Sequence, residues 1–249
     1  MKLSSGLAAA LLAGVATMVT AIPTQAHDSQ TIWNGFYGGF HVGYAQDSSS
    51  ASIQGRDAFS QGLITAGIFP SSMNIQADGV LLGGQVGYNH RHGQFVWGVE
   101  LDASYAKLTG SQTRSVTLGA ELLAVTVDRE INWLSTLRGR VGMLATPSLL
   151  LYATGGLAVG ETNLHAEFID SLPGLTTSGA RTGSKVSVGW TAGGGFEQAL
   201  NNWASMRVEY LYVDLGTQTV APVQINAASY NVSISNTSNV LRAVMNFKF

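Results

Sequence analysis

Eight segments of this chain alternate apolar and polar residues with a period of two, and this pattern most strongly limits the possible folds. Each segment is about 9 to 14 residues long, and the lower end is enough to cross a bilayer as a tilted strand. Strict alternation over such lengths predicts β-strands, and eight of them predict a sandwich or a barrel. The segments are 36–44, 80–90, 95–106, 132–145, 149–160, 185–198, 203–215 and 240–249.

Short and long connections alternate between these segments. The short ones lie around residues 91–93, 146–148 and 200–202. The long ones are rich in Ser, Thr, Gly and Asn and cover roughly 45–79, 107–131, 161–184 and 216–239. Transmembrane barrels sort their connections in this way. We therefore predict an all-β fold: an eight-stranded antiparallel transmembrane up-and-down β-barrel with short periplasmic turns and long extracellular loops.

Charged residues gather on one face of the predicted strands, while the other face is apolar. That sorting places the apolar face in lipid and the charges in the lumen. The predicted lumen network consists of Glu100, Asp102, Arg138, Arg140, Glu197, Arg207, Glu209, Arg242 and Lys248. An eight-stranded barrel is just wide enough for its own side chains, so these charges are expected to pair and fill it. A narrow ion-selective pore is the alternative.

Aromatic residues are expected in two girdles, one at each membrane interface. By strand direction the periplasmic girdle contains Trp33, Phe36, Trp97 and Trp203, with Phe247 and Phe249 on the same rim. The outer girdle contains Tyr44, Tyr105, Trp133 and Tyr212.

The N-terminal residues predict export. A positive start, an apolar stretch over 6–22 and small residues before His27 are typical of a cleaved signal peptide, so we predict a signal peptide over 1–26 and one barrel domain over 27–249. The alternative is a membrane anchor, which is disfavoured because the apolar stretch is short. The chain has 13 basic and 15 acidic residues, and this balance argues against nucleic acid as a partner. The chain has no cysteine, which excludes disulfides and thiolate chemistry.

Few residues indicate chemistry. His41 and His165 are candidate haemin ligands because haem iron takes an axial histidine, although nothing beside either one marks a pocket. His90 and His92 are expected in a solvated turn without metal. The glycine-rich stretches 83–87 and 189–195 lie within strands, so they are expected to make room for bulky neighbours and not to bind phosphate. No catalytic triad, metal or cofactor is predicted. Residues 53–69 carry apolar side chains that either pack above the membrane or offer a contact surface.

Three stretches are similar to a known family: WNGFYGGFHVGY (33–44), GWTAGGGFEQALNNWASMRVEYLYVDLG (189–216) and the closing VMNFKF. They resemble the proteobacterial outer-membrane β-barrels of the opacity-type and OmpA-like group, especially alphaproteobacterial major outer-membrane proteins. The resemblance implies residence in outer-membrane lipid and insertion by the outer-membrane assembly machinery through the C-terminal strand, with Phe249 as the signal. It implies a structural envelope role, with a small diffusion porin or a haemin- or ligand-binding surface protein as alternatives. It implies neither an enzymatic activity nor an oligomeric state.

Overall fold

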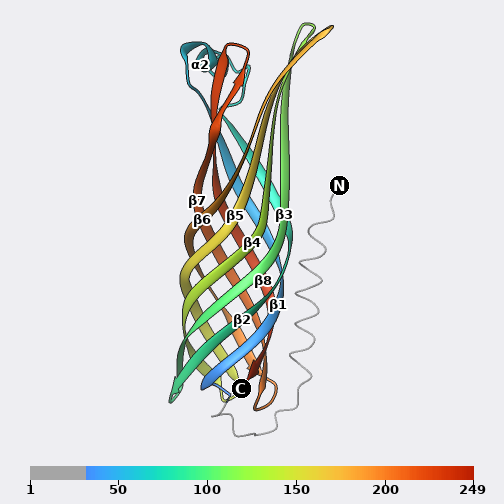
Figure 1. The fold of residues 1–249 in the computed structure, drawn as a ribbon. Helices are drawn as coiled ribbons and strands as arrows, with labels where there is room; N and C mark the ends of the chain where they lie inside the picture. Colours follow the sequence, from blue (N-terminus) through green and yellow to red (C-terminus); the bar gives the residue numbers. More distant parts are fainter. Residues whose placement is uncertain (1–31) are drawn as a thin grey trace.

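The computed structural model describes residues 32–249, which form one closed antiparallel barrel in the order β1 to β8. The predicted signal peptide lies outside the described residues. Each strand pairs with its neighbours in the chain, and β1 pairs with β8 to close the ring, as predicted. Figure 1 shows the strands tilted around a long cylinder. The strands are β1 (Gly35–Gly55), β2 (Ser72–His92), β3 (Phe95–Leu118), β4 (Glu121–Thr146), β5 (Leu149–Leu172), β6 (Leu175–Ala199), β7 (Ala204–Ile225) and β8 (Ala228–Lys248).

The strands are far longer than the sequence segments that predicted them. They run from 21 to 26 residues, whereas about 9–11 are enough to cross a bilayer. Most of the four predicted long loops is therefore strand, and those loop boundaries were wrong. Two-residue turns join β3 to β4, β5 to β6 and β7 to β8 at the outer end. The turn Pro173-Gly174 illustrates the local cause, because Gly174 has a φ of 85°, which glycine adopts without strain. The three predicted short turns at the other end are confirmed.

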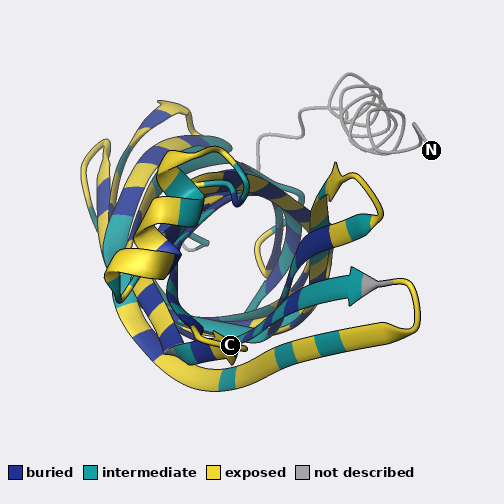
Figure 2. Cartoon of the chain, turned by 90° about the horizontal axis from the view of Figure 1, so that it is seen from above, coloured by how far each residue is buried: buried dark blue, intermediate teal, exposed yellow. Residues whose placement is uncertain are grey.

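The polarity of the alternation inverts along β1, β2, β4, β5, β7 and β8, which explains why the length of these strands was missed. Near the end of β8, Arg242 and Asn246 are buried in the lumen while Met245 faces outward. Nearer its start, Tyr230 and Ile234 are buried and the polar neighbours face outward, and the same alternate positions of β8 face inward throughout. Figure 2 shows the alternating buried and exposed residues along the wall. Water surrounds the upper part of the strands and lipid surrounds the lower part. The apolar side chains therefore point inward above the membrane and outward within it.

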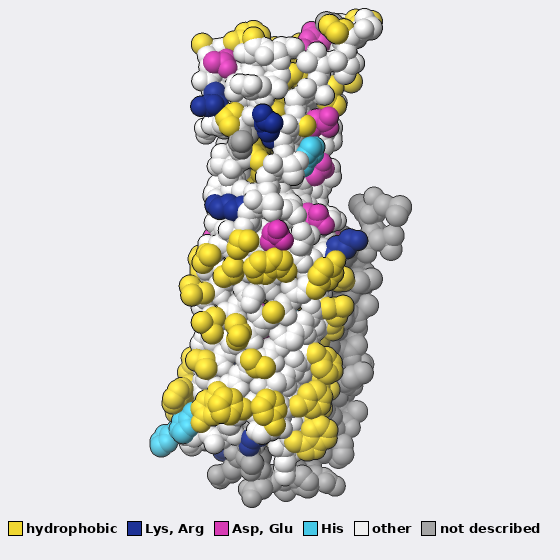
Figure 3. Space-filling model, in the orientation of Figure 1, with side chains coloured by type: hydrophobic (Ala, Val, Ile, Leu, Met, Phe, Trp, Pro, Cys, Tyr) yellow, Lys and Arg dark blue, Asp and Glu magenta, His cyan; other side chains and the backbone are white. Residues whose placement is uncertain are grey.

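An apolar band crosses the lower part of the barrel on the face seen in Figure 3, and charged side chains appear mainly above it. At its lower edge Trp203 stacks on Phe247 with ring centroids 5.8 Å apart, and Phe36 contacts Tyr88 at 4.8 Å. Trp33 does not belong to this girdle, contrary to the prediction. It is buried, and its Nε1 donates a hydrogen bond to Pro147 O at 3.0 Å, so it closes the periplasmic end of the lumen.

The part above the band, which we call the extension, has its own apolar core. Phe168 stacks on Tyr230 at 4.8 Å, and Phe69 meets both rings edge-on at 5.7 and 5.3 Å. A short helix, α2 (Ala58–Thr65), covers this core with Leu63 and Ile64. The sequence did not predict α2. Most apolar residues of 53–69 pack in this core, whereas Phe59 is exposed. Among residues 32–249, no helix is long and apolar enough to span a bilayer.

Asp57 fixes the start of α2, and its removal is expected to loosen the helix. Its carboxylate accepts from Ser60 N at 2.7 Å and from Ser229 N at 3.2 Å. The bond from the Ser60 backbone lowers the pKa of Asp57, so its contribution is present above the ordinary pKa and is lost as the pH falls through the lowered value. Hydrogen exchange of residues 58–65 should accelerate in Asp57→Ala at neutral pH, and in the wild type only at strongly acidic pH.

Asp57→Asn is the matched control, because its amide oxygen still caps the helix. It should protect α2 nearly as well as the wild type, and without the acid dependence. Equal exchange of residues 58–65 in all three proteins at neutral pH would contradict the assigned cap.

Candidate functional site: the lumen network

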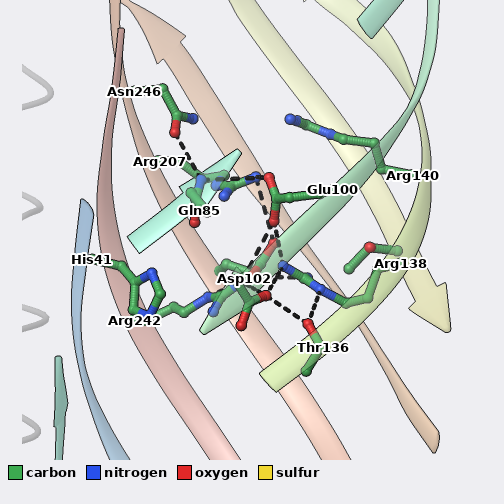
Figure 4. Close-up of polar contacts among 12 residues, drawn as sticks. His41, Gln85, Glu100, Asp102, Thr136, Arg138, Arg140, Arg207, Arg242 and Asn246 are labelled. Atoms are coloured by element: carbon green, nitrogen blue, oxygen red, sulfur yellow. Dashed lines mark hydrogen bonds and ion pairs between the residues drawn. The ribbon is translucent and has the colours of Figure 1, made fainter. Parts of the chain in front are cut away.

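Eight charged side chains meet in the lower lumen, four arginines and four carboxylates, so their formal charges cancel. Five strands supply them, and in each strand the charged residues occupy the alternate positions that face the lumen. Figure 4 shows most of them converging from opposite walls. The structure brings together Glu100 and Asp102 from β3, Arg138 and Arg140 from β4, Glu197 from β6, Arg207 and Glu209 from β7, and Arg242 from β8.

Arg138 is at the centre of this network. Its Nη1 lies 3.1 Å from Glu209 Oε2 and its Nη2 lies 2.9 Å from Asp102 Oδ2, while Nη2 also pairs with Glu100. Its Nε donates to Thr136 Oγ1 at 2.9 Å, so the guanidinium is bonded on both edges. Arg242 Nε donates to the same Glu209 Oε2 at 2.6 Å. Glu209 therefore bridges two arginines from opposite sides of the barrel.

A second group lies nearer the periplasm. Arg140 Nη2 pairs with Glu197 Oε2 at 2.7 Å, and Ser205 Oγ donates to Glu197 Oε1 at 2.6 Å. The Arg140 guanidinium also stacks over the ring of Tyr152, 4.2 Å from its centroid. Arg207 Nη1 lies 2.8 Å from Glu100 Oε2, which links the two groups into one network.

Two tyrosines complete the network, and the sequence analysis did not include them. Tyr37 OH donates to Glu100 Oε2 at 2.7 Å, and Tyr152 OH donates to Glu209 Oε1 at 2.6 Å. Tyr152 lies in a strand without charged residues in its lower half, so nothing in that segment marks which face enters the lumen. Gly87 makes room for Tyr37, because a Cβ there would lie 2.4 Å from the tyrosine oxygen. This confirms the predicted packing role for Gly87, whereas Gly84 lies exposed on the outer wall.

Apolar layers close the lumen on both sides of the charges. Below, Trp33 packs with Val96, Leu144, Leu150 and Tyr152. Above lies a layer that we call the seal, in which neighbours from seven strands meet. Its buried members are Ala45, Leu81, Ala106, Leu108, Ile131, Ala158, Leu211, Val213, Leu215 and Val240. The network is therefore held in a compartment whose two ends are apolar.

Lys248 and Phe249 lie apart from this compartment, contrary to the lumen position predicted for Lys248, whereas His41 lies inside it. Lys248 is half-buried at the end of β8 opposite Tyr37, at the periplasmic rim. Phe249 follows it and is exposed. His41 does enter the lumen, where its Nε2 lies 2.8 Å from Ser104 Oγ.

His165 lies in the extension on β5, with Nδ1 2.8 Å from Thr182 Oγ1 on the outer wall. The structure therefore does not bring the two candidate haemin ligands together, because His41 faces the lumen and His165 faces away from it. Within residues 32–249, no group of three or more His, Asp or Glu side chains could hold a metal ion.

Comparison with known proteins agrees with this architecture. A family model described as outer membrane protein beta-barrel domain matches residues 7–240. A 31 kDa outer-membrane immunogenic protein of Brucella melitensis is 30% identical over 96% of this chain and 93% of its own length. A 22 kDa outer membrane protein of Rhizobium leguminosarum is 34% identical over 53% of this chain and 52% of its own. Among solved structures, the outer membrane protein OprG from Pseudomonas aeruginosa is 16% identical, with a TM-score of 0.48. The match covers 88% of this chain and 99% of OprG.

Proposed function

Because this chain belongs to the outer-membrane β-barrel domain family and resides in the outer membrane, we propose that it is a structural envelope protein with a packed, poorly conducting lumen. One observation supports this proposal above the others: the charge network lies between two apolar layers. An ion crossing the barrel would have to leave water at the periplasmic layer and again at the seal. Apolar constrictions of this kind block ions by excluding water.

The paired charges themselves support the same function. An open pore keeps its charged side chains in water, where they attract passing ions. Here Arg138, Arg207 and Glu209 are almost fully buried and contact one another or tyrosine hydroxyls. Breaking such pairs to admit an ion leaves an uncompensated buried charge, which costs several kcal/mol. The proposal includes no enzymatic activity.

Single-channel recording of the refolded barrel in planar bilayers tests this function. Conductance should be far below that of wide sixteen-stranded porins, because eight strands leave an interior that side chains fill. A large, stable conductance in the wild type would favour the small diffusion porin instead.

Two substitutions in the seal should raise that conductance. Leu211→Asn and Val213→Thr place polar groups in the seal from one strand, so water can enter where it was excluded. We expect more frequent and larger openings in the double variant than in the wild type. Val208→Thr, on the opposite face of the same strand, is the matched control and should leave the current unchanged. If the seal variant and the control conduct alike, the seal is not the barrier.

A further inference from the structure

A second polar layer lies inside the extension, between the seal and the outer apolar core. Along β4, Arg129 follows the core residue Val127 and precedes the seal residue Ile131. Along β8, Asn236 and Ser238 separate Ile234 of the core from Val240 of the seal. The buried polar members of this layer are Asp47, Ser49, Arg129, Thr162, Gln218, Asn236 and Ser238.

Arg129 uses only one of its nitrogen atoms in contacts with described residues. Its Nη1 pairs with Asp47 and donates to Ser49 Oγ at 3.0 Å, and Ser49 in turn donates to Asp47. Its Nε and Nη2 are buried without an acceptor among the described residues. These two atoms form the edge of the guanidinium plane that normally holds two acceptors side by side. A guanidinium edge that is buried without an acceptor in the protein favours an acceptor molecule beside it.

Other side chains of the layer also have buried polar atoms without hydrogen-bond partners among the described residues. Thr162 Oγ1, Gln218 Oε1 and both polar atoms of Asn236 are buried without partners among the described residues. Gln218 Nε2 does donate to Gly183 O at 3.3 Å, so that side chain is held by one end only. These unpartnered atoms therefore include donors and acceptors from four strands of the same interior layer.

We propose that this layer is a hydrated chamber that binds a cluster of ordered water molecules. A water molecule both donates and accepts, so it can accept from Arg129 and donate to the free oxygen of Gln218. The charge balance determines this class of ligand. Asp47 already neutralises Arg129, so a bound anion would add an uncompensated charge to a buried site, which is unfavourable. The chamber thus accepts small neutral hydrogen-bonding molecules and does not hold an anion, whether or not the lower lumen conducts.

Water contact can be measured by NMR on the refolded full-length barrel in detergent micelles. Arg129 Nε–H should show a cross-peak to water in nuclear Overhauser experiments. Arg138 Nε–H is the matched control, because it is equally buried but donates to Thr136 Oγ1. Its water cross-peak should be absent or several-fold weaker. A wild-type Arg129 signal as weak as that of Arg138 would overturn the proposal.

Removing the counter-ion tests the neutrality of the chamber. In Asp47→Asn the Arg129 charge is uncompensated, so bromide added at increasing concentration should shift the Arg129 Nε–H resonance to saturation. The wild type and Asp47→Asn combined with Arg129→Gln should show no saturable bromide effect on the barrel. Saturable bromide binding by the wild type would instead identify an anion site. The water measurement needs no variant, so it decides the proposal even if Asp47→Asn does not fold.

Discussion

Glu209→Ala is expected to lower the free energy of unfolding by about 3–5 kcal/mol, the usual cost of removing one partner from a buried ion pair. Glu209 accepts from Arg138 Nη1, Arg242 Nε and the Tyr152 hydroxyl. The variant leaves two guanidinium groups short of a carboxylate in a compartment closed by apolar layers. Urea titration of the barrel refolded in lipid vesicles measures the loss.

The matched control is Val208→Ala, one residue away on the lipid face. Combining Glu209→Ala with Arg242→Met should restore part of the loss, because the remaining charges balance again and methionine fills the space. That recovery would separate an electrostatic cost from a simple cavity. If Glu209→Ala loses no more than Val208→Ala, the network is not a buried one.

Leu101→Arg should cost roughly 2–4 kcal/mol, because it places a charge in lipid near the middle of the membrane. Leu101 is half exposed on the outer wall of β3, between Val86 and Leu137 of the neighbouring strands. Thr136→Ser, on the lumen face of β4, keeps the hydroxyl that contacts Asp102 and should cost much less. The same vesicle titration compares the two variants.

A position outside the membrane supplies a second control for this prediction. Asn231→Arg lies on the outer face of β8 in the extension, where water surrounds the wall. It should have little effect, because the cost of a charge falls to about 0–1 kcal/mol away from the midplane. Equal losses for Leu101→Arg and Asn231→Arg would mean that the membrane boundary is misplaced.

The sequence predicted the membrane-spanning part well, for a clear physical reason. Lipid on one side and a charged lumen on the other make the alternation strong, as in β3, where Glu100 and Asp102 are buried and Leu101 is exposed. Strand order, the short turns and the family all follow from that pattern and its motifs. The pairing partners of each charge did not follow, because register across the barrel depends on all eight strands at once.

The sequence did not predict the extension, because its apolar side chains point inward and those of the membrane-spanning part point outward. Val125 and Val127, or Val232 and Ile234, alternate with polar residues as clearly as the lower strands do, but their apolar side is inward. A search for lipid-facing stripes treats such segments as polar loops. The expected place of Trp33 failed for another reason: an aromatic residue beside a girdle can also turn inward, and only its contact with Pro147 shows that it does.

The unbroken strands also have a mechanical consequence. No loop or linker separates the extension from the membrane-spanning wall, because each strand runs from one into the other. At about 3.3 Å per residue, the stretch of β3 from Tyr105 to Leu118 is on the order of 40 Å long. A load applied to that turn is carried along the backbone ladder into the barrel itself, which the surrounding lipid must then hold in place.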